Sequence, residues 1–149
     1  MNSSIWFKKD IQKEDISALF KERMLLHLKI RVENIHDNSL VLSMPVTEEI
    51  TQPLGLLHGG ASCVLAESAG SIASNMVIDY NSSYALGLEL NATHLGPAKV
   101  GDILIAVCLP IKIGRTIHSW DISITAQSRE SIISKVRLTT FIKNKLQAN

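Results

Sequence analysis

The residues best suited to chemistry lie in one stretch between Gln52 and Ser71. Two glycines, Gly59 and Gly60, follow His58 there and precede a long apolar segment. Glycine lets the backbone approach a ligand closely, and the first amide N–H groups of a helix have no partner inside the helix. A helix that begins at Gly59 would therefore offer donors to a partial negative charge, such as a polarised carbonyl oxygen.

Two polar side chains follow within the same segment. Glu67 is the only charged residue between Gly59 and Asp79, and Ser71 comes four residues later, on the same face of a helix. A carboxylate on a buried helix is costly unless it is paired or functional. Together with donors at the helix start, the two form a hydrolytic arrangement in which the carboxylate attacks a polarised carbonyl or activates water.

Each of these residues alone also has a plainer interpretation. Many helices begin after glycine, and His58 alone is more often a hydrogen-bonded structural residue. Glu67 could pair with a core arginine, and Ser71 could simply pack in a helix of small residues. The combination of all of them, rather than any single residue, points to catalysis.

The hydrophobic pattern predicts the elements that must position these residues. The segment after Gly59 is small, apolar and nearly uncharged, which is typical of a buried helix. The other segments read as a short helix, strands whose apolar residues alternate, and turns. The predicted helices are 13–23 and 59–78; the predicted strands are 25–35, 40–46, 84–95, 102–113, 116–127 and 132–142, with turns at 36–39, 114–115 and 128–131, and irregular backbone over 47–57.

A single apolar helix among so many strands needs a curved apolar face to cover it. We therefore predict an α+β fold in which one curved antiparallel sheet wraps around a long central helix, within a single domain over residues 1–149. Pro110 inside a predicted strand indicates an edge, a bulge or an interruption, because proline cannot donate to a sheet ladder.

Composition excludes several classes of function. The 149 residues carry a formal net charge of +1 and no basic run, so nothing indicates a nucleic-acid surface. The segment MNSSIWFKKD lacks the apolar core of a signal peptide, and the sequence has no apolar stretch long enough to span a membrane. We therefore expect a cytoplasmic protein without a signal peptide. Cys63 and Cys108 show no metal-ligand spacing, so neither a metal nor a disulfide is expected.

The segment QPLGLLHGGASCVLAESAGSIAS resembles the signature of hotdog-fold acyl-CoA thioesterases of the PaaI-like group. It is most similar to the branch that includes 1,4-dihydroxy-2-naphthoyl-CoA hydrolase and the enterobactin proofreading thioesterase. ALGLELNATHLGPAKVGD, IKIGRTIHSWDISI and KVRLTTFI extend the resemblance over nearly the whole chain. It implies a hotdog fold, a homodimer or tetramer, no cofactor, and hydrolysis of an acyl-CoA whose acyl group is aromatic.

The resemblance also implies roles for individual residues. The Gly59 amide would polarise the thioester carbonyl, and Glu67 would act as nucleophile or general base, in a site shared between two subunits. His58 and Gln52 would orient the thioester and the attacking group, and Ser71 would hold the water or the carboxylate. The residues expected to contact substrate or coenzyme A are Gly60, His94 and Arg115.

One position departs from the family pattern. Relatives often carry an arginine two residues after His94, whereas this chain has Gly96 followed by Pro97. A phosphate contact of coenzyme A is then missing or comes from elsewhere. Arg115, in the turn IGRT, is the leading replacement; a solvated turn charge is its other interpretation.

Two other functions fit the same fold. One is an acyl-thioester dehydratase, which pairs a histidine and a carboxylate around a different local motif that this sequence lacks. The other is a non-catalytic module that binds acyl-CoA, which would have no need of the Glu67 carboxylate. A serine hydrolase is disfavoured, because no GxSxG motif occurs.

Overall fold

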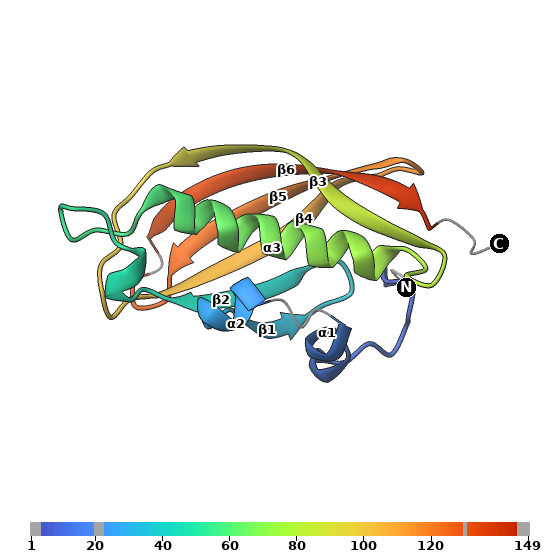
Figure 1. Ribbon diagram of the computed structural model, residues 1–149, viewed down its shortest axis with the longest axis horizontal. Coiled ribbons are helices and arrows are strands. Elements are labelled where there is room, and N and C mark those ends of the chain that lie inside the picture. The colour runs from blue at the N-terminus through green and yellow to red at the C-terminus, as the bar shows by residue number, and fades with distance from the viewer. Residues whose placement is uncertain (1–3, 20–22, 130, 146–149) are drawn as a thin grey trace.

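A long helix lies against the concave face of one antiparallel sheet (Figure 1). The computed structural model describes residues 4–19, 23–129 and 131–145. Within them, the six strands follow the order β1-β2-β4-β5-β6-β3. The elements are α1 (Lys13–Leu19), α2 (Arg23–His27), β1 (Arg31–Ile35), β2 (Leu40–Pro45), a 3-10 turn (Glu48–Ile50), α3 (Gly59–Val77), β3 (Ser83–His94), β4 (Ile103–Ile113), β5 (Ile117–Ala126) and β6 (Ile132–Asn144).

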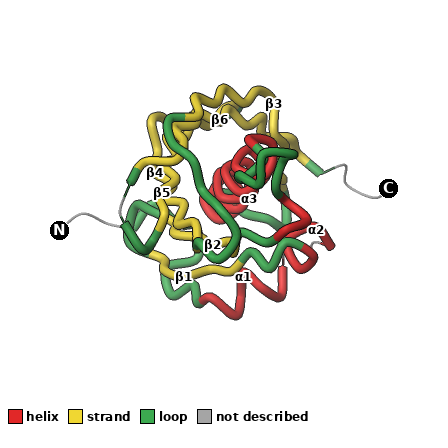
Figure 2. Tube along the Cα trace, turned by 90° about the vertical axis from the view of Figure 1, so that its left-hand side faces the viewer, coloured by secondary structure: helices red, strands yellow, loops and turns green. Residues whose placement is uncertain are grey.

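The sheet curves around α3 without closing, as the view along the helix shows (Figure 2). Helix α3 buries Leu65, Ile72 and Met76, which belong to the same core as Leu104 and Leu138 of the sheet. Each such side chain contributes about 1.5–3 kcal/mol on full burial. The predicted curved antiparallel sheet around a central helix is confirmed, while the single domain over residues 1–149 stays a prediction.

Strands β4 and β5 alternate as the sequence predicts. Up to the bulge in β4 and along β5, their inward residues are buried, as Leu104 and Ile122 illustrate, whereas their outward neighbours are partly exposed. The β4–β5 register shifts between Pro110 and Lys112. Pro110 therefore lies at a bulge, one of the three interpretations that its position left open.

Buried hydrogen bonds fix α3 on the sheet. The Ser74 hydroxyl lies 2.7 Å from that of Thr140 on β6, and it accepts from the indole N–H of Trp120 on β5, also at 2.7 Å. Asn75 binds the backbone of β3 with both ends of its amide: it accepts from the Ala85 N–H at 2.9 Å and donates to the Ala85 carbonyl at 3.3 Å. Because buried polar groups are costly unless paired, these bonds fix how far α3 slides along the sheet.

The predicted strand over 25–35 is wrong in its first half. Residues 23–27 form α2, and Leu26, expected on the apolar face, is 73% exposed. Lys29 adopts a left-handed conformation with φ 56°, and the Ile30 N–H donates to the Leu25 carbonyl at 2.8 Å. This is a Schellman-type helix end, which apolar alternation does not reveal. The first predicted helix is confirmed as α1 up to Leu19; positions 20–22 lie outside the described residues.

Strand β3 forms one edge of the sheet, next to β6. Its residues Leu86 and Leu88 are 51% and 61% exposed. An edge strand has unpaired backbone groups on one side, and exposed leucines beside them favour pairing with another chain. In the described part of the chain, no helix has both the length and the apolar character needed to cross a membrane.

Candidate active site

The first turn of α3 presents one unused backbone donor. The His58 Nδ1 accepts from the Gly60 N–H at 2.9 Å, and the His58 carbonyl accepts from the Ala61 N–H at 2.9 Å. Among the described residues, none accepts a hydrogen bond from the Gly59 N–H. At the positive end of a 19-residue helix, this N–H is suited to a carbonyl oxygen that gains negative charge.

The imidazole of His94 packs directly on Gly59. A Cβ atom built on Gly59 would lie 2.6 Å from the His94 Nε2, which is too close for any real contact. The other ring nitrogen, Nδ1, lies 3.3 Å from the Ser134 hydroxyl. A side chain at position 59 would therefore have to displace either the exposed His94 ring, which β3 places beside the helix start, or the helix start itself.

The Glu67 carboxylate lies on the open side of α3. The sequence analysis predicts that this carboxylate lies on a buried helix. That prediction is wrong for the single chain, in which Glu67 is exposed. The physical reason is that the sheet does not close, so one side of the apolar helix stays uncovered. Glu67 lies next to β3: a Cβ atom on Gly87 would overlap its Oε1 and lie 3.2 Å from its carboxyl carbon.

Within one chain, Gly59 and Glu67 are too far apart to act on the same carbonyl group. Glu67 follows Gly59 by eight residues, which corresponds to about 12 Å along a helix axis. A thioester carbonyl bound to the Gly59 N–H would therefore lie beyond attacking distance of the carboxylate in its own chain. The two groups can act together only if Glu67 comes from a second chain.

Gln52 and Ser71 lie close to these two groups along the chain. The Gln52 Oε1 accepts from the Leu54 N–H at 2.7 Å, so its side chain closes the short loop that also contains Gly55 at φ 75°. Ser71 is half-buried one turn after Glu67. Its carbonyl accepts from the Asn75 amide at 2.9 Å, the amide that also binds β3.

Arg115 and Gly59 lie at opposite ends of the sheet. Arg115 is exposed in the β4–β5 turn, next to the end of β6 that pairs with the start of β3, because the Ile142 N–H donates to the Thr116 carbonyl at 2.8 Å. Gly59 instead lies at the end of β3, against His94. In one chain, therefore, Arg115 does not reach a ligand at the start of α3.

A hollow beside the start of α3 contains two cations that the sequence analysis missed. Lys99 and Arg129 line it together with apolar side chains. It lies beside the start of α3 because the N–H of Leu57, just before the helix, donates to the Ala98 carbonyl at 2.7 Å. Arg129 is already paired with Asp102 at 3.0 Å, which leaves Lys99 as the available charge. Lys99 follows Gly96 by three residues, whereas the fold brings Arg129 there from a distant part of the sequence.

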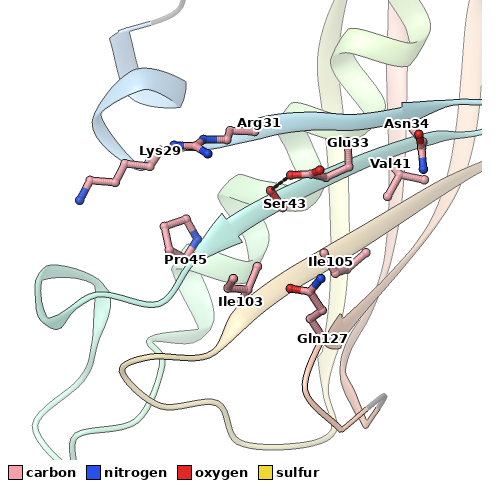
Figure 3. Close-up of a pocket in the computed structure, with 10 residues that line it drawn as sticks. All are labelled: Lys29, Arg31, Glu33, Asn34, Val41, Ser43, Pro45, Ile103, Ile105 and Gln127. Carbon is pink, nitrogen blue, oxygen red and sulfur yellow. Dashed lines mark hydrogen bonds between the residues drawn. The ribbon is translucent and has the colours of Figure 1, made fainter.

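A second hollow lies on the outer face of β1, β2 and β4 (Figure 3). Arg31, Glu33 and Ser43 line it, and the Ser43 hydroxyl donates to the Glu33 carboxylate. On β2 the neighbours Leu42 and Met44 point to the core on the opposite face. This hollow contains none of the predicted site residues, so we do not assign it to the reaction.

The Cys63 thiol, one turn before Glu67, is a poor competitor for the role of nucleophile. Burial, and secondly the charge of Glu67, raise the pKa of this thiol above its ordinary value of 9.0. We expect slow reaction with a thiol reagent at pH 7, an increase above pH 9, and turnover that survives Cys63→Ala. Glu67→Gln should make the thiol react faster at fixed pH, as a stopped-flow assay in each variant would measure. An unchanged or slower rate in Glu67→Gln would contradict the charge coupling.

Metal chemistry has no visible site in the described ranges. No group of three or more His, Cys, Asp or Glu side chains there is arranged to hold a metal ion. Cys63 and Cys108 are both free thiols, and Cys108 is buried.

Comparison with known proteins identifies the family of this chain. Residues 54–133 match the family model of the thioesterase superfamily. The 1,4-dihydroxy-2-naphthoyl-CoA hydrolase of Escherichia coli is 41% identical over 138 residues, which is 93% of this chain and 98% of that one. A crystal structure of a glutamine-to-alanine mutant of the thioesterase PA1618 from Pseudomonas aeruginosa superposes with a TM-score of 0.89 at 40% identity, covering 95% and 100% of the two chains.

A second solved structure has the same fold. The thioesterase HI1161 of Haemophilus influenzae gives a TM-score of 0.88 at 32% identity, covering 97% of this chain and 99% of the other. The chain belongs to the thioesterase superfamily. The hotdog fold and the enzyme class, a thioester hydrolase, are confirmed.

Proposed function

We propose that this thioesterase hydrolyses an acyl-CoA to the free acid and coenzyme A, at a site built from two copies of the chain. The Gly59 N–H of one copy polarises the thioester carbonyl. The Glu67 carboxylate of the other copy either attacks that carbonyl or removes a proton from an attacking water. In both routes the carbonyl–sulfur bond breaks, the thiol of coenzyme A leaves, and water supplies the new oxygen of the acid.

The observation that carries this proposal is the separation of donor and carboxylate on one helix. Gly59 offers an unused N–H, while Glu67, the only carboxylate between Gly59 and Asp79, is exposed about 12 Å further along the helix. Pairing of two β3 edges around a two-fold axis would place the two α3 helices side by side and antiparallel. The exposed Leu86 and Leu88 on β3 favour that pairing.

The polar residues near the site take supporting roles in this proposal. His58 is already used as the cap of α3, so it orients the helix start, while Gly60 keeps the backbone there accessible. Ser71 and Gln52 hold the attacking group and the thioester. His94 contacts the substrate beside Gly59, where its ring already lies.

For the acyl group we propose an aromatic acid, such as 1,4-dihydroxy-2-naphthoyl or a benzoyl-type group. The support is the name of the Escherichia coli relative, a 1,4-dihydroxy-2-naphthoyl-CoA hydrolase. A panel of acyl-CoA thioesters with thiol release as readout tests this. We expect the highest kcat/KM with aromatic acyl groups; a preference for long aliphatic chains would contradict the proposal.

A mixing experiment tests the shared site. Glu67→Gln and Gly59→Ala variants, each nearly inactive, are unfolded together and refolded as mixed dimers. If each site takes Gly59 from one chain and Glu67 from the other, a mixed dimer contains one intact site, and random pairing restores about a quarter of the wild-type activity. If each site lies within one chain, the mixture stays inactive. Light scattering should show a dimer or tetramer, and an active monomer would exclude the shared site.

Arg115 is proposed to bind the phosphates of coenzyme A from the partner chain, since it does not reach the site in its own chain. Arg115→Ala should then raise KM with little change in kcat, because the contact is the same in ground and transition states. Lys99→Ala, which removes the cation beside Gly96, is the matched comparison. An unchanged KM in Arg115→Ala would assign this residue to the solvated surface.

A further inference from the structure

At a bulge in β3, the direction in which successive residues point is inverted. As a result, two residues of β3 that would otherwise point to opposite faces both lie against α3. In a regular strand, residues seven positions apart point to opposite faces. Gly87 and His94 are seven apart, yet Gly87 faces Glu67 and His94 faces Gly59. The β3–β6 register shifts between Gly87 and Glu89, which adds one residue and restores a common facing.

The space that a side chain would fill at Gly87 is occupied by the Glu67 carboxylate. The three atoms nearest to a Cβ built there all belong to Glu67: the Oε1 would overlap it, and the carboxyl carbon and Cγ would lie 3.2 and 4.0 Å away. The φ angle of Gly87 lies outside the left-handed range. The glycine is therefore needed here for space and not for backbone conformation.

We propose that Gly87 is a positioning residue for the reaction: its missing side chain lets the Glu67 carboxylate rest on the backbone of β3 at the bulge. This inference rests on the proposed function, in which Glu67 is the reacting carboxylate. The carboxylate is exposed and forms no ion pair with any described residue. Contact with β3 is thus what limits its conformations on that side.

A second glycine provides a matched control. A Cβ on Gly70 of α3 would lie 2.5 Å from the Leu138 Cδ2, in the fully buried core. A collision there strains packed side chains, so Gly70→Ala should lower stability. At Gly87 the colliding atom is the free end of a flexible side chain, which can rotate away. Gly87→Ala should therefore keep the fold while it displaces the carboxylate.

The experiment compares Gly87→Ala with wild type by kinetics, thermal unfolding and a crystal structure. We expect kcat to fall about 100-fold with KM within about twofold, because a displacement near 1 Å costs about that much. The melting temperature should stay unchanged, whereas Gly70→Ala should lower it. The crystal structure should show the Glu67 carboxylate rotated away and the β3 backbone in place.

A double variant tests whether Gly87 acts through Glu67. Aspartate at position 67 is shorter and leaves room for a Cβ at position 87, so Gly87→Ala should cost much less in the Glu67→Asp background than in wild type. A wild-type kcat in Gly87→Ala would overturn the proposal, as would an equal loss in the Glu67→Asp background. So would a crystal structure in which β3 moves and the carboxylate stays.

Failure of the proposed function gives a different pattern. If Glu67→Gln retains the wild-type kcat, the carboxylate does not react and the proposed mechanism fails. The positions of the carboxylate and of β3 in the Gly87→Ala crystal structure would still decide whether Gly87 sets the place of Glu67.

Discussion

Glu67→Gln is expected to lower kcat by about 10²–10⁴-fold, the size that general-base assistance alone supplies. Glutamine keeps the shape of the side chain but removes its charge and basicity. KM should change far less, because the carboxylate acts on the carbonyl in the transition state rather than in binding. Glu67→Asp should keep a remnant of activity, since the same group is present but misplaced. Steady-state kinetics with the preferred acyl-CoA measure both.

The control for this variant is Glu14→Gln on α1, an exposed carboxylate far from α3 in sequence. It should leave kcat unchanged. Because Glu67 is itself exposed, its substitution should alter stability by no more than about 0.5 kcal/mol. A Glu67→Gln enzyme that turns over at the wild-type rate would refute the mechanism and most of the site assignment.

Gly59→Ala is expected to reduce kcat by about 10²–10³-fold, the cost of losing one donor to a developing oxyanion. The added methyl would lie 2.6 Å from the His94 Nε2, so either the histidine or the first turn of α3 must move. Movement of that turn takes the N–H away from the carbonyl oxygen. The loss should appear in kcat more than in KM, as single-turnover kinetics can separate.

His94→Ala tests whether the clash between the new methyl and His94 causes that loss of activity. It removes the ring that collides with the new methyl, so the double variant with Gly59→Ala should be more active than Gly59→Ala alone if steric displacement is the cause. Thermal unfolding of each variant checks that α3 still forms. A Gly59→Ala enzyme with wild-type kcat would contradict the expected displacement of the N–H, because alanine keeps that group and only His94 would then have moved.

The sequence predicted α3 and the later strands well, because their apolar periodicity reports directly on the core. It also singled out Gly59 and Glu67, since a glycine pair and a lone charge stand out in an apolar segment. The exposure of Glu67 was predicted wrongly. The apolar composition of a helix indicates that most of its surface is buried, and it does not show which side the sheet leaves open.

Other features depend on contacts between distant residues. The start of β1 was missed because the end of α2 depends on the left-handed backbone of Lys29, which has no strong residue signature. Gly87 and Arg129 were missed because each is defined by a contact with a residue distant in the sequence: Gly87 with Glu67, and Arg129 with Asp102 beside Gly96. A glycine inside a strand pattern was the one available signal for Gly87.

The order of the strands has a consequence for how the protein folds during its synthesis. Strand β3 follows α3 directly in the chain, but its partner in the sheet is β6, and Ser83 pairs with Asn144. Until the ribosome has released β6, β3 has no strand beside it and α3 lacks part of its cover. Such distant pairings slow folding, because the chain loses the conformational entropy of a long loop before the strand contacts can compensate for it. We therefore expect the groups proposed for the reaction on α3 and β3 to be aligned late, after the segment 132–144 has been made.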